Sequence, residues 1–332
     1  GGGVLTYTSN SGFTGTETFT YKANDGTSDS NVAQVSIEVI EKDPSLNWAT
    51  YFTSAYYYGH SQAEKDNQGN LYLVGSFYDF SNFKDNTTLN AIYSNGDKDG
   101  FYAKYNEDGE LLWANTFGGL HYDQADDIKI ASDGNIIVSG RIEKNATFAD
   151  GEELGDVNSS FDKWYNVILK LDSQTGDIIW KTYTGYEVEM DWEMADNNSI
   201  LIKNDGTIVS VINNMAWNNE DRVIILEVDS SDGSFDLVSE NTENNYSFRS
   251  TYDVTLDSND NIYMIGRYYD IWSGATQQEE AAVRKYDTNY NIDWEFRLNG
   301  SNQDFGNSLV YDPVNNLIYI SGRVLGTDLN PL

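Results

Sequence analysis

The chain has 332 residues, 39% of them hydrophobic, which is enough for one large all-β domain and a small neighbour. Its 53 acidic and 20 basic residues give a formal net charge of −33, which disfavours nucleic acid and anionic membrane surfaces as partners. It has no Cys and no apolar stretch of about 18 residues, which excludes disulfides, thiolate metal sites and a transmembrane helix. We therefore expect no nucleic-acid binding and no membrane insertion.

Residues 1–43 alternate polar and apolar side chains in a way that predicts three short strands. We expect these strands at residues 4–8, 16–23 and 33–40, with Gly- and Asn-rich turns between them. In the last strand Val35, Ile37 and Val39 share one face, so that face is expected to pack against a core.

The run from Gly12 to Val39 resembles the closing half of a bacterial cadherin-like, immunoglobulin-fold repeat. The matching residues are Phe13, Gly15, Phe19, Tyr21, Asp25 and Gly26. A complete immunoglobulin-like sandwich needs about 100 residues. The resemblance therefore implies a partial immunoglobulin-like β-sandwich over residues 1–43, followed by a second domain over residues 44–332.

From residue 44 onward the sequence repeats. A polar turn leads into a short β-rich run in five copies, which end at positions 75, 140, 211, 266 and 322, four of them Gly. The second half of each unit predicts a hairpin, as where Phe101–Tyr105 turns into Leu111–Trp113. Four short strands with turns need roughly 45 residues, so each copy predicts one propeller blade. Insertions are expected near residues 80–100, 143–163, 213–221 and 268–280.

These copies resemble the bacterial β-propeller repeat family known as SBBP, whose string is close to Asp-x-x-Gly-Asn-x-Tyr-Val-x-Gly. Residues 133–141 and 257–267 match it best. The resemblance implies an all-β chain holding an incomplete β-propeller of about five blade units, which continues beyond residue 332, and export from a bacterial cell. The run Leu171–Trp180 also resembles the tryptophan-docking repeat of quinoprotein propellers, in which the Trp packs between blades.

Catalytic chemistry finds little support in the sequence. Two His and no Cys leave no Ser/His/Asp or Cys/His set, so we predict no catalytic and no cofactor-binding residues. One acidic run alternates with apolar residues and admits two interpretations, a strand with a solvated acidic face or a sugar-binding rim with an aromatic platform. The candidate rim residues are Glu187, Glu189, Asp191, Trp192 and Glu193.

Calcium is the metal ion that the sequence favours, because carboxylates and amides recur at short spacing. The candidate ligands are Asp123, Asp126, Asp127, Asp257, Asn259 and Asn261. None of these runs fits the twelve-residue helix-flanked calcium loop, and the same residue types are ordinary turn formers. A structural calcium ion is therefore a hypothesis beside the alternative of plain turn chemistry.

These observations favour a non-enzymatic module of a large exported bacterial cell-surface protein, serving adhesion, a filament or a ligand-binding scaffold. Its expected location is extracellular, at the cell surface. Its expected partners are a protein or glycan ligand, or other modules of the same long chain. One alternative is a secreted carbohydrate-active propeller enzyme that uses the acidic and aromatic rim. Another is a propeller that acts only as a spacer.

Overall fold

The chain folds from strands and turns. The computed structural model describes residues 13–24, 26–39, 52–53, 61–84, 89–143, 145–153, 164–184, 198–214, 222–242, 246–270, 278–299, 304–323 and 330–331. Across these ranges the secondary structure is antiparallel β, with no helix, which confirms the all-β prediction. The chain divides into two compact units, Gly1–Ala49 and Thr50–Leu332. The boundary expected between residues 43 and 44 stays a prediction, because residues 40–51 lie outside the described part.

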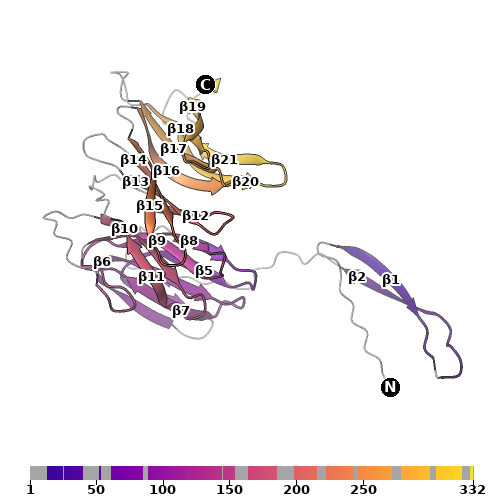
Figure 1. The fold of residues 1–332 in the computed structure, drawn as a ribbon. Helices are drawn as coiled ribbons and strands as arrows, with labels where there is room; N and C mark the ends of the chain where they lie inside the picture. The colour runs from indigo at the N-terminus through magenta and orange to yellow at the C-terminus, as the bar shows by residue number, and fades with distance from the viewer. Residues whose placement is uncertain are drawn as a thin grey trace. The chain divides into compact units, whose positions relative to one another are not determined.

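The first unit contains one antiparallel hairpin of β1 (Gly15–Tyr21) and β2 (Ala33–Val39), drawn in indigo and violet in Figure 1. The register pairs Phe19 with Val35, and side chains along β2 alternate between half-buried and exposed. This alternation is the one that the sequence predicts, since residues at every second position share one face of a strand.

The second unit is a series of antiparallel sheets in which strands pair in chain order (Figure 1). The first sheet contains β3 (Phe52–Thr53), β4 (Ser61–Lys65), β5 (Leu71–Lys84), β6 (Leu89–Tyr105) and β7 (Leu111–Phe117). The second contains β8 (Gln124–Ile130), β9 (Ile136–Glu143), β10 (Trp164–Leu171) and β11 (Ile178–Tyr183). The third contains β12 (Asn198–Ile202), β13 (Ile208–Asn214), β14 (Arg222–Val228) and β15 (Phe235–Thr242).

The fourth sheet contains β16 (Tyr246–Leu256), β17 (Ile262–Asp270), β18 (Gln278–Tyr286), β19 (Ile292–Asn299) and the short β22 (Asn330–Pro331). It is followed by a two-stranded hairpin of β20 (Phe305–Asp312) and β21 (Leu317–Arg323). Tight turns join β8 to β9 and β10 to β11, for example, and a tight turn can join only antiparallel neighbours.

The hydrophobic core lies between successive sheets. Ile137 and Ile168 of the second sheet, for example, pack in one cluster with Ile224 of the third sheet. All three side chains are fully buried, and each such burial contributes about 2 kcal/mol. The first long strand of each sheet also contacts the first strand of the next sheet. Thus β8 contacts β4 and β12, and β16 contacts β12 and β20. Each sheet is therefore placed by the sheets next to it in the chain.

One predicted feature of the first sheet differs in the structure. The insertion expected near residues 80–100 forms no separate loop, because β5 and β6 continue through much of it as a long hairpin. Phe80, Phe83 and Tyr93 in this stretch favour extended backbone. At the start of this sheet, Phe52 of β3 pairs with Phe83 of β5.

Candidate functional site

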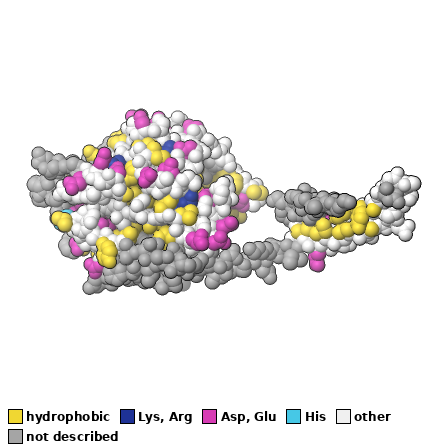
Figure 2. Space-filling view, turned by 90° about the horizontal axis from the view of Figure 1, so that it is seen from below, with side chains coloured by type: hydrophobic (Ala, Val, Ile, Leu, Met, Phe, Trp, Pro, Cys, Tyr) yellow, Lys and Arg dark blue, Asp and Glu magenta, His cyan; other side chains and the backbone are white. Residues whose placement is uncertain are grey.

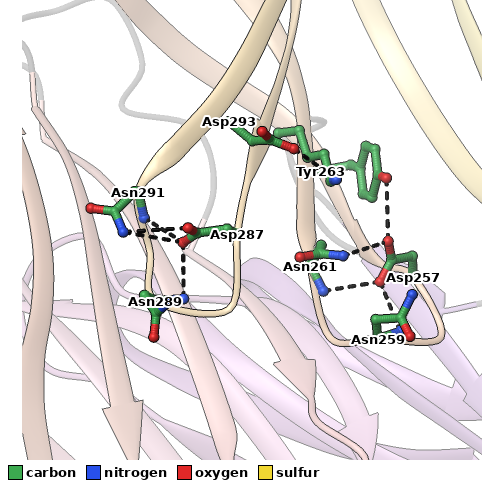
Figure 3. Close-up of polar contacts among 9 residues, drawn as sticks. Asp257, Asn259, Asn261, Tyr263, Asp287, Asn289, Asn291 and Asp293 are labelled. Carbon is green, nitrogen blue, oxygen red and sulfur yellow. Dashed lines mark hydrogen bonds and ion pairs between the residues drawn. The ribbon is translucent and has the colours of Figure 1, made fainter.

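The polar turn that opens each repeat is built around one carboxylate. In the turn between β16 and β17, Asp257 Oδ1 accepts the backbone N–H groups of Asn259 and Asn261 at 2.8 and 3.0 Å. Its Oδ2 accepts the Asn261 side-chain amide at 2.8 Å and the Tyr263 hydroxyl at 3.3 Å (Figure 3). Burial opposes ionisation, but these donors together hold the pKa of Asp257 below its usual value.

The turn between β4 and β5 repeats this arrangement. Asp66 accepts the backbone N–H groups of Gln68 and Asn70 and the hydroxyl of Tyr72, at distances of 2.8 to 3.3 Å. The two turns have the same geometry, which explains the Asp-x-x-x-Asn-x-Tyr pattern that the two repeats share. The carboxylate closes the turn, and the Tyr lies on the strand that follows it.

A tryptophan and a lysine join the first sheet to the second. Lys104 is the penultimate residue of β6 and pairs across the strands with Trp113, the third residue of β7. Lys104 Nζ donates to the backbone oxygen of Ser173 at 2.7 Å, in the turn between β10 and β11. A Cβ atom on Gly176 of that turn would lie 2.8 Å from Trp113 Cδ2. The indole therefore needs a glycine in the next sheet.

The second and third sheets are joined in the same way. Lys170 Nζ and Trp180 Nε1 both donate to the backbone oxygen of Ser230, at 2.6 and 3.1 Å. A Cβ atom on Gly233 would lie 2.6 Å from Trp180 Cε3. The Trp180 side chain is buried, as the resemblance to the tryptophan-docking repeat implies for a Trp between sheets.

The third and fourth sheets use a different pair of residues. At the positions of the lysine and tryptophan the third sheet carries Glu227 and Leu237, and Tyr290 stands where the earlier turns have glycine. The Tyr290 hydroxyl donates to Glu227 Oε1, which also pairs with Lys203 Nζ at 2.6 Å. Burial, together with the charge of Glu227, raises the pKa of Tyr290. At this junction the large aromatic side chain belongs to the facing turn, whereas at the two earlier junctions it belongs to the outer strand.

A polar cavity of about 730 Å³ opens between turns of the first and second sheets. It is lined by Lys65, Asp66, Asn67, Gln68, Asn70, Tyr72, Ile130, Ala131, Ser132, Asp133, Gly134, Ser173 and Gln174. Its two carboxylates are already used, Asp66 in its own turn and Asp133 in an ion pair with Lys170 at 2.7 Å. Hydrogen bonds hold the pKa of both carboxyls low against the opposing effect of burial. The cavity therefore offers amides and hydroxyls, and its carboxylates are unsuited to acid catalysis at neutral pH.

Three carboxylates are buried where the first two sheets meet. Asp126 pairs with Arg141 at 3.1 Å, and both side chains are almost fully buried. Asp123 accepts backbone N–H groups from Gly119 and Glu143 at 2.8 and 2.7 Å, while Asp99 accepts one from Asn95 at 2.9 Å. Burial raises the pKa of both Asp99 and Asp123 to about 7. These three carboxyl groups have a structural role, because each contacts protein backbone or an ion-pair partner.

The calcium candidates fall into two separate places. Asp123 and Asp126 lie at the start of β8, and Asp127 accepts the backbone N–H of Ile200 at 2.9 Å. Asp257, with Asn259 and Asn261, forms the turn described above. Within the ranges that the structure describes, no group of three or more His, Asp or Glu is arranged to hold a metal ion. Every candidate carboxylate serves as a hydrogen-bond acceptor for the protein itself, and calcium binding stays a prediction.

The candidate sugar-binding rim, Glu187, Glu189, Asp191, Trp192 and Glu193, lies outside the described residues. Of the two His, His60 also lies outside them, while the His121 ring approaches Glu143 Oε2 at 3.9 Å. Across the described ranges no helix has the length and hydropathy to cross a membrane. Figure 2 shows acidic side chains spread over the visible face of the second unit, with few basic ones among them.

Sequence reasoning missed the lysine at the sheet junctions. The signal was available, because a lysine occupies the penultimate place of the third strand in three units, each followed by a tryptophan in the outer strand. The buried Asp99 had no such signal, since it is one of many acidic residues in a long insertion.

Residues 1–38 match the family model of the bacterial Ig domain. This match confirms the immunoglobulin-like prediction for the N-terminal segment. Bacterial Ig-like domains typically occur in exported or surface proteins. No curated protein matches the chain.

Several solved structures align with the chain at low similarity. A protein of unknown function from Dyadobacter fermentans is 12% identical, with 77% of this chain and 72% of that chain covered and a TM-score of 0.43. The rhamnogalacturonan lyase YesW is 14% identical over 96% of this chain and 65% of its own, with a TM-score of 0.41. A Bacillus licheniformis rhamnogalacturonan lyase is 13% identical over the same shares, with a TM-score of 0.41. The chain thus spans about two thirds of each lyase, and TM-scores this low establish neither a common fold nor a common activity.

Proposed function

We propose that this chain is a non-enzymatic binding and scaffold module of an exported bacterial cell-surface protein. The observation that carries the proposal is the bacterial Ig domain match over residues 1–38, directly before a unit of docked sheets. The charge of −33 and the absence of Cys are compatible with a large exported protein that is stabilised by packing alone.

For the second unit we propose a β-propeller arrangement built from repeats of the SBBP type. Three features support it. Four sheets follow one another with up-and-down strand order, the first strand of each sheet contacts the first strand of the next, and apolar clusters fill the space between neighbouring sheets. First strands that meet around an axis while outer strands face outward are the arrangement of propeller blades.

The polar cavity between the first two sheets is the surface that we propose for ligand binding. Asn67, Gln68, Ser132 and Gln174 present side-chain amides and a hydroxyl at turns, where loops on a rigid scaffold commonly carry binding residues. Such groups donate and accept hydrogen bonds in pairs, as a hydroxyl-rich ligand does. A glycan at the cell surface is therefore the partner class that suits this cavity.

Two measurements test this proposal. Protease treatment and antibody labelling of intact cells of the source bacterium should reach the chain, whereas labelling only after lysis contradicts a surface location. A glycan array probed with the purified chain should give binding that Gln174→Ala weakens. Gln34→Ala, on the exposed face of β2, serves as the matched control and should leave binding unchanged. Release of new chain ends from any bound polysaccharide would contradict the non-enzymatic assignment.

A further inference from the structure

The end of the fourth sheet carries the same docking residues as the end of the first. Lys285 pairs across the strands with Trp294, as Lys104 pairs with Trp113. Tyr263 lies against Trp294 at 5.9 Å between ring centroids, as Tyr72 lies against Trp113 at 6.0 Å. Figure 3 shows Tyr263 above the Asp257 turn that holds its hydroxyl. This set of three residues is called the docking triad below.

In the first sheet the docking triad is covered by the next sheet, and in the fourth it is open. Lys104 Nζ reaches a backbone oxygen of the following turn, whereas Lys285 Nζ pairs with Asp293 of its own sheet at 2.9 Å. Trp180 of the second sheet has 9% of its surface exposed, and Trp294 has 41%. In the part of the chain that the structure describes, the fourth sheet therefore has the residues of a junction without the turn that covers them in the earlier junctions.

The β20–β21 hairpin covers only the inner part of this face. Leu309 and Ile318 pack with Ile265 and Val283 in one apolar cluster. By comparison with the second sheet, β20 and β21 hold the places of β8 and β9. Every residue of β9 is buried, while all but one of β21 are exposed, among them Tyr319 at 53%. In the described residues the edge of β21 that a third strand would pair with carries no strand.

The junctions already formed indicate what fits the open one. Where the outer strand carries Trp113 or Trp180, the facing turn has a glycine, and where it carries Leu237, the facing turn has Tyr290. The outer strand of the fourth sheet carries Trp294. Its complement is thus a turn with glycine at that position and a free backbone oxygen for Lys285.

We propose that the docking triad of the fourth sheet and the open edge of β21 form one interaction surface for a strand–turn–strand unit of the same repeat. The unit would add the third and fourth strands to the sheet that β20 and β21 begin, and a glycine in its turn would lie on Trp294. We assign it to the same polypeptide, because each formed junction joins sheets that are consecutive in the chain. The proposal does not depend on the cellular role of the protein.

A thiol-labelling experiment tests this surface, because the chain has no Cys and one introduced Cys reports on one position. In Ile320→Cys, on the same face of β21 as Ile318 and exposed at 41%, the thiol should react quickly with a maleimide. A second version carries a copy of residues 164–184, the chain's own third and fourth strands with their glycine turn, joined after residue 332 by a flexible Gly/Ser linker. Tethering supplies a high effective concentration, so the labelling rate should fall by about tenfold.

Two controls make the result specific to docking. Replacing the glycine of the appended turn, the copy of Gly176, by Val should restore fast labelling, because a side chain there would meet the indole. Trp294→Ala in the acceptor sheet should also restore it. Unchanged labelling in the fused chain overturns the proposal, and so does slowing that is equal with Val. If the unfused chain labels more slowly at higher concentration and elutes as a dimer, the occupant is a second copy, and our assignment is wrong.

Discussion

The substitution Asp99→Asn should stabilise the protein more at pH 8 than at pH 5. Asp99 lies in β6 with no exposed surface, and its Oδ1 atom is buried without a hydrogen-bond partner. Burial raises the pKa of Asp99 to about 7, against an ordinary value of 3.8. The folded state therefore holds this proton more tightly than the unfolded state does.

The sign and size of the effect follow from this difference in pKa. Between about pH 4 and pH 7 the folded state binds more protons than the unfolded state, so the free energy of unfolding falls as the pH rises and then levels off. The full conversion of the pKa difference is about 4 kcal/mol, and relaxation around the charge lowers it. We expect Asp99→Asn to raise the free energy of unfolding by about 2 kcal/mol at pH 8 and by less than about 1 kcal/mol at pH 5.

Urea denaturation at the two pH values measures this change. The exposed Asp108→Asn is the matched control and should have the same small effect at both. Asp123→Asn provides a contrast, because burial also raises the pKa of Asp123 to about 7 but its oxygens accept two backbone N–H groups. An amide has one oxygen and should lose one of these bonds. Equal effects of Asp99→Asn at pH 5 and pH 8 would refute the reasoning.

Three further substitutions test the sheet junctions and the buried ion pair by chemical denaturation. Gly233→Ala should lower the free energy of unfolding by about 3 kcal/mol, because the new Cβ would meet the Trp180 indole. Gly134→Ala, which has a similar backbone conformation but open space around it, should lower the free energy of unfolding by about 1 kcal/mol. Equal losses would contradict the clash. Lys170→Met should lower the free energy of unfolding by about 2 kcal/mol, because Lys170 bonds across a formed junction. Lys285→Met, on the open face of the fourth sheet, should lower it by less than about 0.5 kcal/mol. The reverse order would contradict the role of this lysine in joining sheets. Arg141→Met should cost about 3 kcal/mol by stranding its buried carboxylate partner, and neutralising that partner should recover part of the loss.

Much of the fold could be predicted from the sequence because the repeat fixes it locally. The alternation of Val35, Ile37 and Val39 and the turns that open each unit depend on neighbouring residues, and both appear where expected. The extension of β5 and β6 was missed because an insertion of mixed polar and aromatic residues can form either a loop or a hairpin, and the choice depends on pairing partners. Whether the sheets close into a disc depends on contacts that no local pattern records.

The candidate site was harder to predict, for a physical reason. Asp123 and Asp257 were identified as oxygen ligands from spacing alone, yet both accept hydrogen bonds from nearby backbone, which spacing cannot distinguish from metal binding. The Lys104–Trp113 pair works across a junction to a turn about 60 residues further on. Its partners belong to the next sheet, so no local pattern in the sequence indicates them.

The changed junction between the third and fourth sheets has a consequence for how the repeats sort themselves. Four similar units in one chain could pair in a wrong order while folding, since strands of one unit resemble strands of another. Glu227 would face a backbone oxygen, and so be repelled, if the glycine turn of another unit took the place of the Tyr290 turn. Conversely, Tyr290 would collide with Trp113 or Trp180. A single junction of opposite polarity thus fixes the fourth sheet as the successor of the third, while units with a glycine turn stay interchangeable with one another.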